Sequence, residues 1–400
     1  MPVANVRREG IGSPEQTAMI YFDHAATTPV RDEVRAAMAE AEAAAFGNPS
    51  SPHAVGRRAR QALDEARERI VALLGGRTTG RDRDRLIFTS GATEANRLAV
   101  LGMAGRGSVA CRFSARDHGS LAAAARELAG RGGDVAALPL LGSGQLDCRA
   151  IRWNTPSGRR ILCTTLVCGQ TGSLEDMAAV AAAAAGCLVH VDATQAIATE
   201  QVSFAQIDAA SLACAPHKFG GPRGIGGLLV RSGTPLEAVT PGPQEAGLRG
   251  GTEPVTLAVG FALALELAVA SREREAARRR GLRDRLEQAL VAAARQVGCH
   301  ALVIAGDAPR NASIATIAFP GIDRQAFVMA ADIEGVCCAT GTACASGSSL
   351  PAPALEAAGL PPAITRSAVR FSVGRTTTDD DIASAVSRLT RVLGRAPLSA

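Results

Sequence analysis

An aspartate and a lysine each follow an apolar run of strand length. Asp192 closes the run 187–191, whose β-branched residues predict a buried strand, and Lys218 follows the run 209–215 in a turn rich in Gly and Pro. A buried carboxylate needs a positive partner. Pyridoxal phosphate (PLP) uses both residue types, because the lysine forms a Schiff base and the aspartate keeps the pyridine nitrogen protonated. The pair predicts a PLP site.

Taken singly, each of these residues has an ordinary interpretation. A strand-end Asp is typical of a helix cap, and a loop Lys is typical of a solvated surface. His217 stands beside Lys218, and glycines follow at 220, 221 and 224. The combination favours the cofactor site over the ordinary interpretation.

A third stretch is suited to binding a phosphate group. The apolar strand expected at 86–89 leads into Ser90-Gly91-Ala92-Thr93-Glu94, where a helix begins. Backbone N–H groups at a helix N-terminus point at an anion, and small residues permit close approach. Ala92 and Thr93 are the candidate phosphate contacts, although a simple Ser/Thr helix cap has the same pattern.

Composition limits the class of protein. The chain has 400 residues, of which 47% are hydrophobic and 20% charged, with a net charge of +5. These values are typical of a globular protein with room for two domains. No long basic run with interleaved aromatics indicates direct nucleic-acid binding. No signal peptide or membrane span is expected, and residues 1–18 are expected to form a flexible leader.

The ten cysteines show no framework spacing, which favours a reducing compartment and a cytoplasmic location. Cys337 and Cys338 continue an apolar strand and are expected to be buried. They match no His or Cys group at metal-ligand spacing, so no metal site is expected. Cys344 lies among Gly, Thr, Ala and Ser, in a loop where an exposed thiol can ionise and attack.

Several segments, in order along the chain, resemble those of cysteine desulfurases, which are fold-type I PLP enzymes of the class V aminotransferase family. They are Tyr21-Phe22-Asp23-His24-Ala25-Ala26-Thr27-Thr28-Pro29, Gly47-Asn48-Pro49-Ser50, the segment 90–96, His190-Val191-Asp192-Ala193-Thr194-Gln195, His217-Lys218 with its glycines, the segment around Cys344, and Arg370-Phe371-Ser372-Val373-Gly374-Arg375. The resemblance covers about residues 21–393. The spacing of Cys344 and Arg370 resembles the long-loop branch of the family.

The resemblance implies a role for each matching residue. Lys218 carries the cofactor, His118 stacks on its ring and moves protons, and Cys344 takes sulfur from L-cysteine as a persulfide. The remaining cofactor contacts that it implies are Ala92, Thr93, Asp192, Gln195, His217 and, across a homodimer interface, Thr252. Arg370 would bind the substrate carboxylate, Asn48 would lie near it, and Arg375 is expected to be structural.

Two positions depart from the family pattern. Gly169 stands where the family has an Asn that contacts the cofactor's phenolic oxygen, and Ala215 stands where it has a Ser that contacts the phosphate. Each lost neutral hydrogen bond is worth about 1 kcal/mol. We therefore expect weaker PLP retention, with the site preserved.

The expected fold is α/β: a large PLP-binding domain over residues 19–262, with a mixed, mostly parallel sheet flanked by helices, and a smaller α+β domain over 263–400 that carries the Cys344 loop. From Val255 to about Val297 the chain is expected to be helical, with a break at Gly281. The terminal helix 379–393 is expected to be capped by Thr378.

The function expected from the resemblance is conversion of L-cysteine to L-alanine, with delivery of sulfur to an acceptor protein. The destination of the sulfur, in iron–sulfur cluster assembly or in tRNA, cofactor or DNA thiolation, stays open. Selenocysteine lyase or another class V aminotransferase-like activity is an alternative. The departures at Gly169 and Ala215 leave a further alternative, a non-catalytic scaffold that kept the fold.

Overall fold

A computed structural model describes residues 19–154, 158–341 and 352–395, so the predictions for the leader and for Cys344 lie outside the described residues. The strands are β1 (Ile20–Tyr21), β2 (Arg85–Thr89), β3 (Val109–Ser114), β4 (Asp134–Leu138), β5 (Arg159–Thr165), β6 (Leu188–Asp192), β7 (Ser211–Cys214), β8 (Gly226–Val230), β9 (Leu302–Val303), β10 (Ile314–Ala318), β11 (Val336–Cys337) and β12 (Ala368–Ser372). The α-helices are α1 (Asp32–Ala44), α2 (Ala54–Leu73), α3 (Ala92–Ala104), α4 (Gly119–Gly130), α5 (Met177–Ala183), α6 (Phe204–Ile207), α7 (Val255–Gln296), α8 (Arg324–Ile333), α9 (Pro353–Ala357), α10 (Pro362–Thr365) and α11 (Asp379–Arg395).

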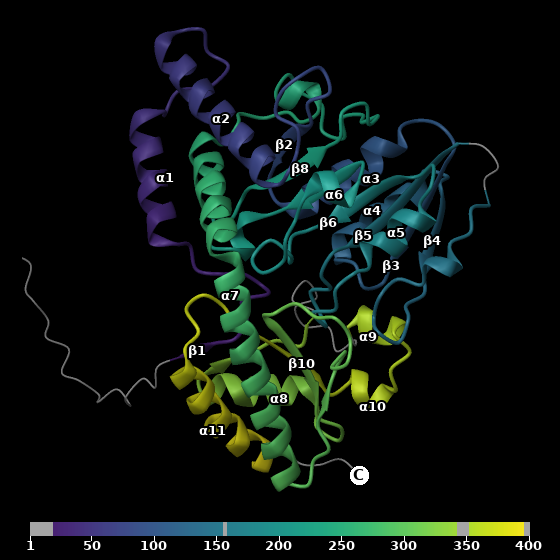
Figure 1. The fold of residues 1–400 in the computed structure, drawn as a ribbon, viewed down its shortest axis with the longest axis vertical. Helices are drawn as coiled ribbons and strands as arrows, with labels where there is room; N and C mark the ends of the chain where they lie inside the picture. The colour runs from purple at the N-terminus through teal and green to yellow at the C-terminus, as the bar shows by residue number, and fades with distance from the viewer. Residues whose placement is uncertain (1–18, 155–157, 342–351, 396–400) are drawn as a thin grey trace, which may run out of the picture.

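A seven-stranded sheet in the order β2-β8-β7-β6-β5-β3-β4 forms the upper part of the molecule (Figure 1). All neighbouring pairs from β4 to β7 are parallel, and β8 runs antiparallel to both of its neighbours. The predicted mixed, mostly parallel sheet is confirmed. Parallel strands are buried on both faces by crossover helices, which is why the strands are continuous apolar runs in the sequence.

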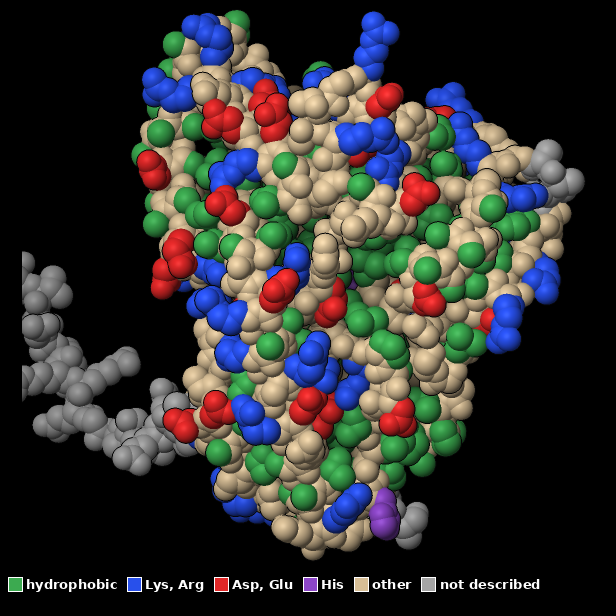
Figure 2. All heavy atoms as spheres, viewed as in Figure 1, with side chains coloured by type: hydrophobic (Ala, Val, Ile, Leu, Met, Phe, Trp, Pro, Cys, Tyr) green, Lys and Arg blue, Asp and Glu red, His purple; other side chains and the backbone are tan. Residues whose placement is uncertain are grey.

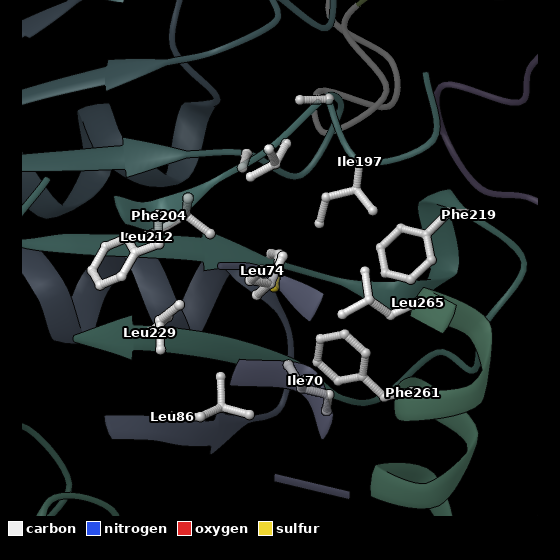
Figure 3. Packing of buried hydrophobic residues seen from close by; sticks show 14 of the residues in the cluster. Ile70, Leu74, Leu86, Ile197, Phe204, Leu212, Phe219, Leu229, Phe261 and Leu265 are labelled. Atoms are coloured by element: carbon white, nitrogen blue, oxygen red, sulfur yellow. The ribbon is translucent and has the colours of Figure 1, made fainter. Parts of the chain in front are cut away.

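Each face of this sheet has its own core. Successive residues of a strand point to opposite faces, so Leu228 packs with α3 and α4 while Leu229 packs with α2 and α7. Figure 3 shows the second of these cores, where Phe219 and Phe261 lie beside each other and near Leu265. Their ring centroids lie 6.1 Å apart. The sheet is thus held rigidly between two helical layers.

A separate core lies below the seven-stranded sheet, in the lower part of the molecule. It is built on the antiparallel sheet β12-β10-β9 and helices α8 and α11. Phe319 stacks on Phe327 there, with ring centroids 5.1 Å apart. The start of the described chain belongs to this unit, because β1 pairs with β11 in parallel. Thr378 caps α11 as predicted, since its hydroxyl accepts the N–H of Asp381 at 3.1 Å.

Helix α7 joins the two units (Figure 1) and corrects one prediction. It runs for 42 residues without a break at Gly281. An interior glycine costs about 1 kcal/mol in a helix, and packing along both units outweighs that cost. The upper core ends at Ala268 and the lower one begins at Leu282. We propose that the domain boundary lies between those residues, inside the helix, rather than at residue 262.

By length and composition alone, α7 is apolar enough to cross a membrane, contrary to the expectation that no segment approaches a membrane span. Its apolar half packs in the upper core through residues such as Phe261 and Leu265, and the core helix of a globular protein satisfies the same test.

Figure 2 shows positive and negative side chains interspersed on the face viewed.

Candidate active site

The carboxyl ends of β6 and β7 bring the first two candidate residues together. Asp192 is the last residue of β6, and Lys218 ends a single 3₁₀ turn (Pro216–Lys218) just after β7. The two strands are parallel neighbours with Asp192 opposite Ala213. Ligands of open α/β sheets bind at this edge. The tertiary structure therefore places the acid and the amine at one end of the sheet.

The amine of Lys218 is held by the N-terminal segment that the sequence also singled out. Its Nζ donates to the carbonyl oxygens of Ala25 at 2.6 Å and Ala26 at 2.8 Å. The amide of Gln195 donates to the same Ala25 oxygen at 2.8 Å. Lys218 and Gln195, 23 residues apart in sequence, thus meet at one backbone atom.

Asp192 is 3% exposed and keeps its two oxygens in hydrogen bonds. Oδ1 accepts the backbone N–H of Thr194 at 2.9 Å, and Oδ2 accepts the side-chain amide of Asn96 at 2.8 Å. Donors on both oxygens compensate for burial of the carboxylate. They also fix its orientation.

The N-terminus of α3 provides a site of the kind that binds phosphate. Ala92 and Thr93 precede the first intrahelical bond, from Ala95 N to Gly91 O at 3.1 Å, so their N–H groups have no helical acceptor. The backbone of Gly226 lies against this turn: a Cβ at that position would meet the carbonyl carbon of Gly91 at 2.5 Å. Only glycine allows β8 to approach so closely.

Two histidines stand near Lys218. His118 caps α4, and its Nδ1 lies 3.2 Å from the N–H and 2.8 Å from the hydroxyl oxygen of Ser120. His217 contacts the Thr27 hydroxyl at 3.2 Å. Burial, followed by the charges of Lys218, Arg223 and His118, lowers the pKa of His217 to about 4. His217 is therefore neutral near pH 7.

Arg370 reaches the site from the other unit. It lies on β12, 4% exposed, and donates from its two Nη atoms to Gly169 O at 2.7 Å and to Asp23 Oδ1 at 2.9 Å. Its Nε is buried and has no partner among the described residues. A buried N–H without an acceptor is costly, and a carboxylate is the ligand that this planar fork fits. The geometry suits binding of a substrate carboxylate.

The two sequence departures are both visible in the structure. A Cβ on Gly169 would lie 3.3 Å from Nε2 of Gln195, so the Gln195 side chain lies over the space that a longer residue would need. Ala215 is 1% exposed and offers no hydroxyl. Weaker cofactor retention stays a prediction.

The structure does not draw Asn48 and Thr252 into contact with the other candidates. Asn48 is exposed, and its side-chain oxygen accepts the N–H of Ser50 at 2.9 Å, which is a local turn. Thr252 is exposed in the loop before α7. Their roles stay proposals, and Cys344 lies outside the described residues.

Two participants were missed by the sequence reasoning. Asp23 pairs with Arg370, and its signal was an acid directly after a short strand, inside a segment already recognised. Asn96, which is 0% exposed, binds Asp192. Its signal was weaker: an amide side chain in the first half of a helix that also carries Glu94 and Arg97.

A buried acid next to His118 has a perturbed pKa. Burial raises the pKa of Asp117 to about 8, although its Oδ2 accepts the N–H of Ser114 at 2.8 Å. Its Oδ1 has no partner among the described residues. Asp117 is therefore mostly protonated at neutral pH.

The residues present fit PLP. Asp192 and Lys218 lie at the ends of adjacent strands. The N-terminus of α3, against which Gly226 packs closely, can bind a phosphate group. The buried Nε–H of Arg370 has no partner among the described residues and can donate to a carboxylate. Over the described residues, no group of three or more His, Cys, Asp or Glu is placed to hold a metal ion. The nine cysteines described are all free thiols.

The comparisons with known proteins agree with this chemistry. The family model for class V aminotransferases matches residues 20–384. An IscS-like cysteine desulfurase of Mycobacterium tuberculosis is 34% identical over 390 residues, covering 94% of this chain and 97% of the relative. Among solved structures, a NifS-like protein superposes with a TM-score of 0.83 at 25% identity, covering 94% of this chain and 99% of its own. A structure described as SspA in complex with cysteine has a TM-score of 0.73 at 27% identity, covering 88% and 98%.

Proposed function

The chain belongs to the class V aminotransferase family, and on that premise we propose that it is a PLP-dependent cysteine desulfurase. L-cysteine would be converted to L-alanine, with its sulfur passed to Cys344. The thiolate of Cys344 attacks the substrate sulfur, the substrate's C–S bond breaks, and a persulfide forms on Cys344. The electron pair left on the substrate carbon takes up a proton, which completes alanine.

The observation that carries this proposal is the convergence of three side chains from separate elements. Asp192 and Lys218 come from adjacent strands of the large sheet, and Arg370 crosses from β12 to bond Gly169 O beside them. Asp192 would pair with the pyridine nitrogen of PLP and the Lys218 amine with its aldehyde. The planar guanidinium of Arg370 would donate hydrogen bonds to the substrate carboxylate. An amino acid substrate of a PLP enzyme needs all three.

When bound, PLP supplies an electron sink for bond breaking at the substrate's α-carbon. Asp192, fixed by Thr194 and Asn96, would hold the pyridine nitrogen protonated. The N–H groups of Ala92 and Thr93 would hold the phosphate. Lys218 and His118 would move protons, and Arg370 would orient the substrate carboxylate.

The first experiment is an absorption spectrum of the purified protein, followed by addition of L-cysteine. We expect a near-visible band that shifts on addition, with release of alanine and, in the presence of a thiol reductant, sulfide. A protein that stays colourless after incubation with PLP would refute the proposal and favour the scaffold alternative.

A variant then tests the sulfur step. Cys344→Ser should abolish persulfide formation while leaving the cofactor spectrum intact. Cys338→Ser is the matched control, because Cys338 is half-buried, rather than fully buried as expected, and burial raises the pKa of its thiol. Persulfide formation by Cys344→Ser would contradict the assignment. Comparing L-cysteine with L-selenocysteine, in parent and variant, separates a desulfurase from a selenocysteine lyase.

We further propose that the active unit is a cytoplasmic homodimer in which Thr252 of one protomer contacts the phosphate held by the other. The support is family membership and the exposed position of Thr252 beside Arg249, which bonds Glu94 in the first turn of α3. Sulfur would pass from Cys344 to an acceptor protein, in iron–sulfur cluster assembly or another thiolation pathway. Sedimentation equilibrium of parent and Thr252→Ala, with PLP affinity for both, tests the dimer.

A further inference from the structure

A buried chain of hydrogen bonds connects Asp192 with His118. Asn96 is fully buried on α3 and donates from Nδ2 to Asp192 Oδ2 at 2.8 Å and to Ser120 Oγ at 2.9 Å. Ser120 Oγ lies 2.8 Å from His118 Nδ1. One amide group therefore links the strand-end acid to the histidine that caps α4.

The direction of each bond follows from chemistry. A carboxylate only accepts, so the NH₂ end of Asn96 must face Asp192, and its Oδ1 must face the other way. There Oδ1 lies 2.9 Å from His190 Nε2, so His190 carries its proton on Nε2. Its Nδ1, 2.9 Å from the Ser211 hydroxyl, is then the acceptor. Burial lowers the pKa of His190 to about 4, so the ring is neutral.

The same reasoning fixes His118. The second N–H of Asn96 takes one of the two lone pairs of Ser120 Oγ, and the Ser120 hydroxyl keeps one proton that it can donate to His118 Nδ1. The backbone N–H of Ser120 points at the same nitrogen at 3.2 Å. Two donors meet Nδ1, so neutral His118 must carry its proton on Nε2.

We propose that Asn96 is a positioning residue which, through Ser120, holds His118 in the Nε2–H tautomer and couples it to Asp192. His118 then presents a proton donor, rather than an acceptor, at Nε2 when neutral. Because Asn96 fixes Asp192 through the same amide, the group that holds the ring nitrogen and the group that moves protons are oriented together. The assignment of proton movement to His118 rests on the proposed function, whereas the tautomer does not.

The test is a long-range ¹H–¹⁵N correlation spectrum of the full-length protein with PLP, labelled with ¹⁵N-histidine. The chain has six histidines, and His118→Gln and His190→Gln identify the two signals. We expect the Nε2–H pattern for both residues. An Nδ1–H pattern for His118 overturns the proposal.

Two matched variants separate the relay from a general loss of packing. Ser120→Ala removes the hydroxyl next to His118, and Ser211→Ala removes another buried hydroxyl at the other end of the network. We expect Ser120→Ala to give a mixture of His118 tautomers and Ser211→Ala to leave the His118 signal unchanged. An unchanged His118 signal in both variants, or the same change in both, overturns the role of Ser120.

Asn96→Leu provides the kinetic test. The side chain of Asn96 bonds Asp192, Ser120 and His190, and among the described residues it makes no hydrogen bond to Arg370 or to the carbonyls around Lys218. Its loss should therefore act on kcat rather than on KM. We expect kcat to fall at least three- to tenfold, the factor that one neutral hydrogen bond represents, together with the His118 tautomer mixture. A fall in kcat with an unchanged tautomer contradicts the relay. Absence of any desulfurase activity with the expected tautomers would refute the proposed function and leave the network standing.

Discussion

Replacing Arg370 with lysine tests whether the fork on β12 recognises the substrate. Arg370→Lys keeps the positive charge but loses the planar set of donors. In the structure, each Nη atom donates one N–H, to Gly169 O at 2.7 Å and to Asp23 Oδ1 at 2.9 Å, and the buried Nε–H has no partner among the described residues. A ligand carboxylate would take that N–H. Lysine carries all three of its donors on one atom and has none at the position of that Nε–H.

The expected magnitude follows from that single donor. A hydrogen bond to a charged group contributes about 1.5–3 kcal/mol, and each 1.4 kcal/mol is about tenfold in affinity. The KM for L-cysteine should therefore rise by about 10- to 150-fold. The contact exists in ground state and transition state alike, so kcat should change much less.

The assay is alanine release against L-cysteine concentration for the parent, Arg370→Lys and Arg375→Lys. Arg375 lies on the same segment with its side chain exposed, so its substitution controls for the general loss of an arginine. Thermal unfolding of each variant reports any cost from the lost contact with Asp23. A KM for Arg370→Lys within about threefold of the parent, in a folded protein, would refute the reasoning.

Three further outcomes are expected. Gly226→Ala should destabilise the protein by about 1–3 kcal/mol in urea unfolding and weaken PLP binding, because its Cβ would meet the backbone of Gly91 at 2.5 Å; unchanged unfolding would show that β8 can shift. The pKa values of His190 and His217 are lowered to about 4. Between about pH 4 and 6.5 these two histidines are therefore protonated in the unfolded chain but neutral in the folded one. The free energy of unfolding should rise with pH over that range. The pKa of Asp117 is raised to about 8, so its contribution is present at low pH and lost as pH rises through 8. Stability should then fall between pH 6.5 and 8, and Asp117→Asn should remove that fall; a variant that still declines over that range would show that another group causes it.

Local features of the sequence were sufficient to predict many of the secondary elements, although strands β4 and β8 and helix α8 were not predicted. Buried parallel strands are apolar runs, helices repeat every 3.6 residues, and caps such as Thr378 mark their ends, because each of these depends on nearby residues only. A clear failure was Gly281. Its intrinsic preference indicated a break in α7, and packing of the helix against both cores outweighed about 1 kcal/mol.

The sequence alone also identified Asp192 and Lys218, because an acid and a lysine that both follow apolar strands, with His217 and glycines nearby, favour a cofactor site together. Their proximity required the sheet order, in which β6 and β7 are parallel neighbours. Likewise, the sequence named Arg370 only through the family pattern, and its bonds to Gly169 and Asp23 join positions 201 and 347 residues away. No local pattern encodes such contacts.

Asn96 marks the limit of sequence reasoning most clearly. In the sequence it is one of several polar residues in the first half of α3, with no spacing that points to Asp192 or His118. The fold brings α3, α4 and β6 together, so that one amide bonds both Asp192 and Ser120. The residue types that can do chemistry were thus determined by the sequence, whereas their orientation and protonation were decided by tertiary packing, because hydrogen bonds in a buried network depend on which elements meet.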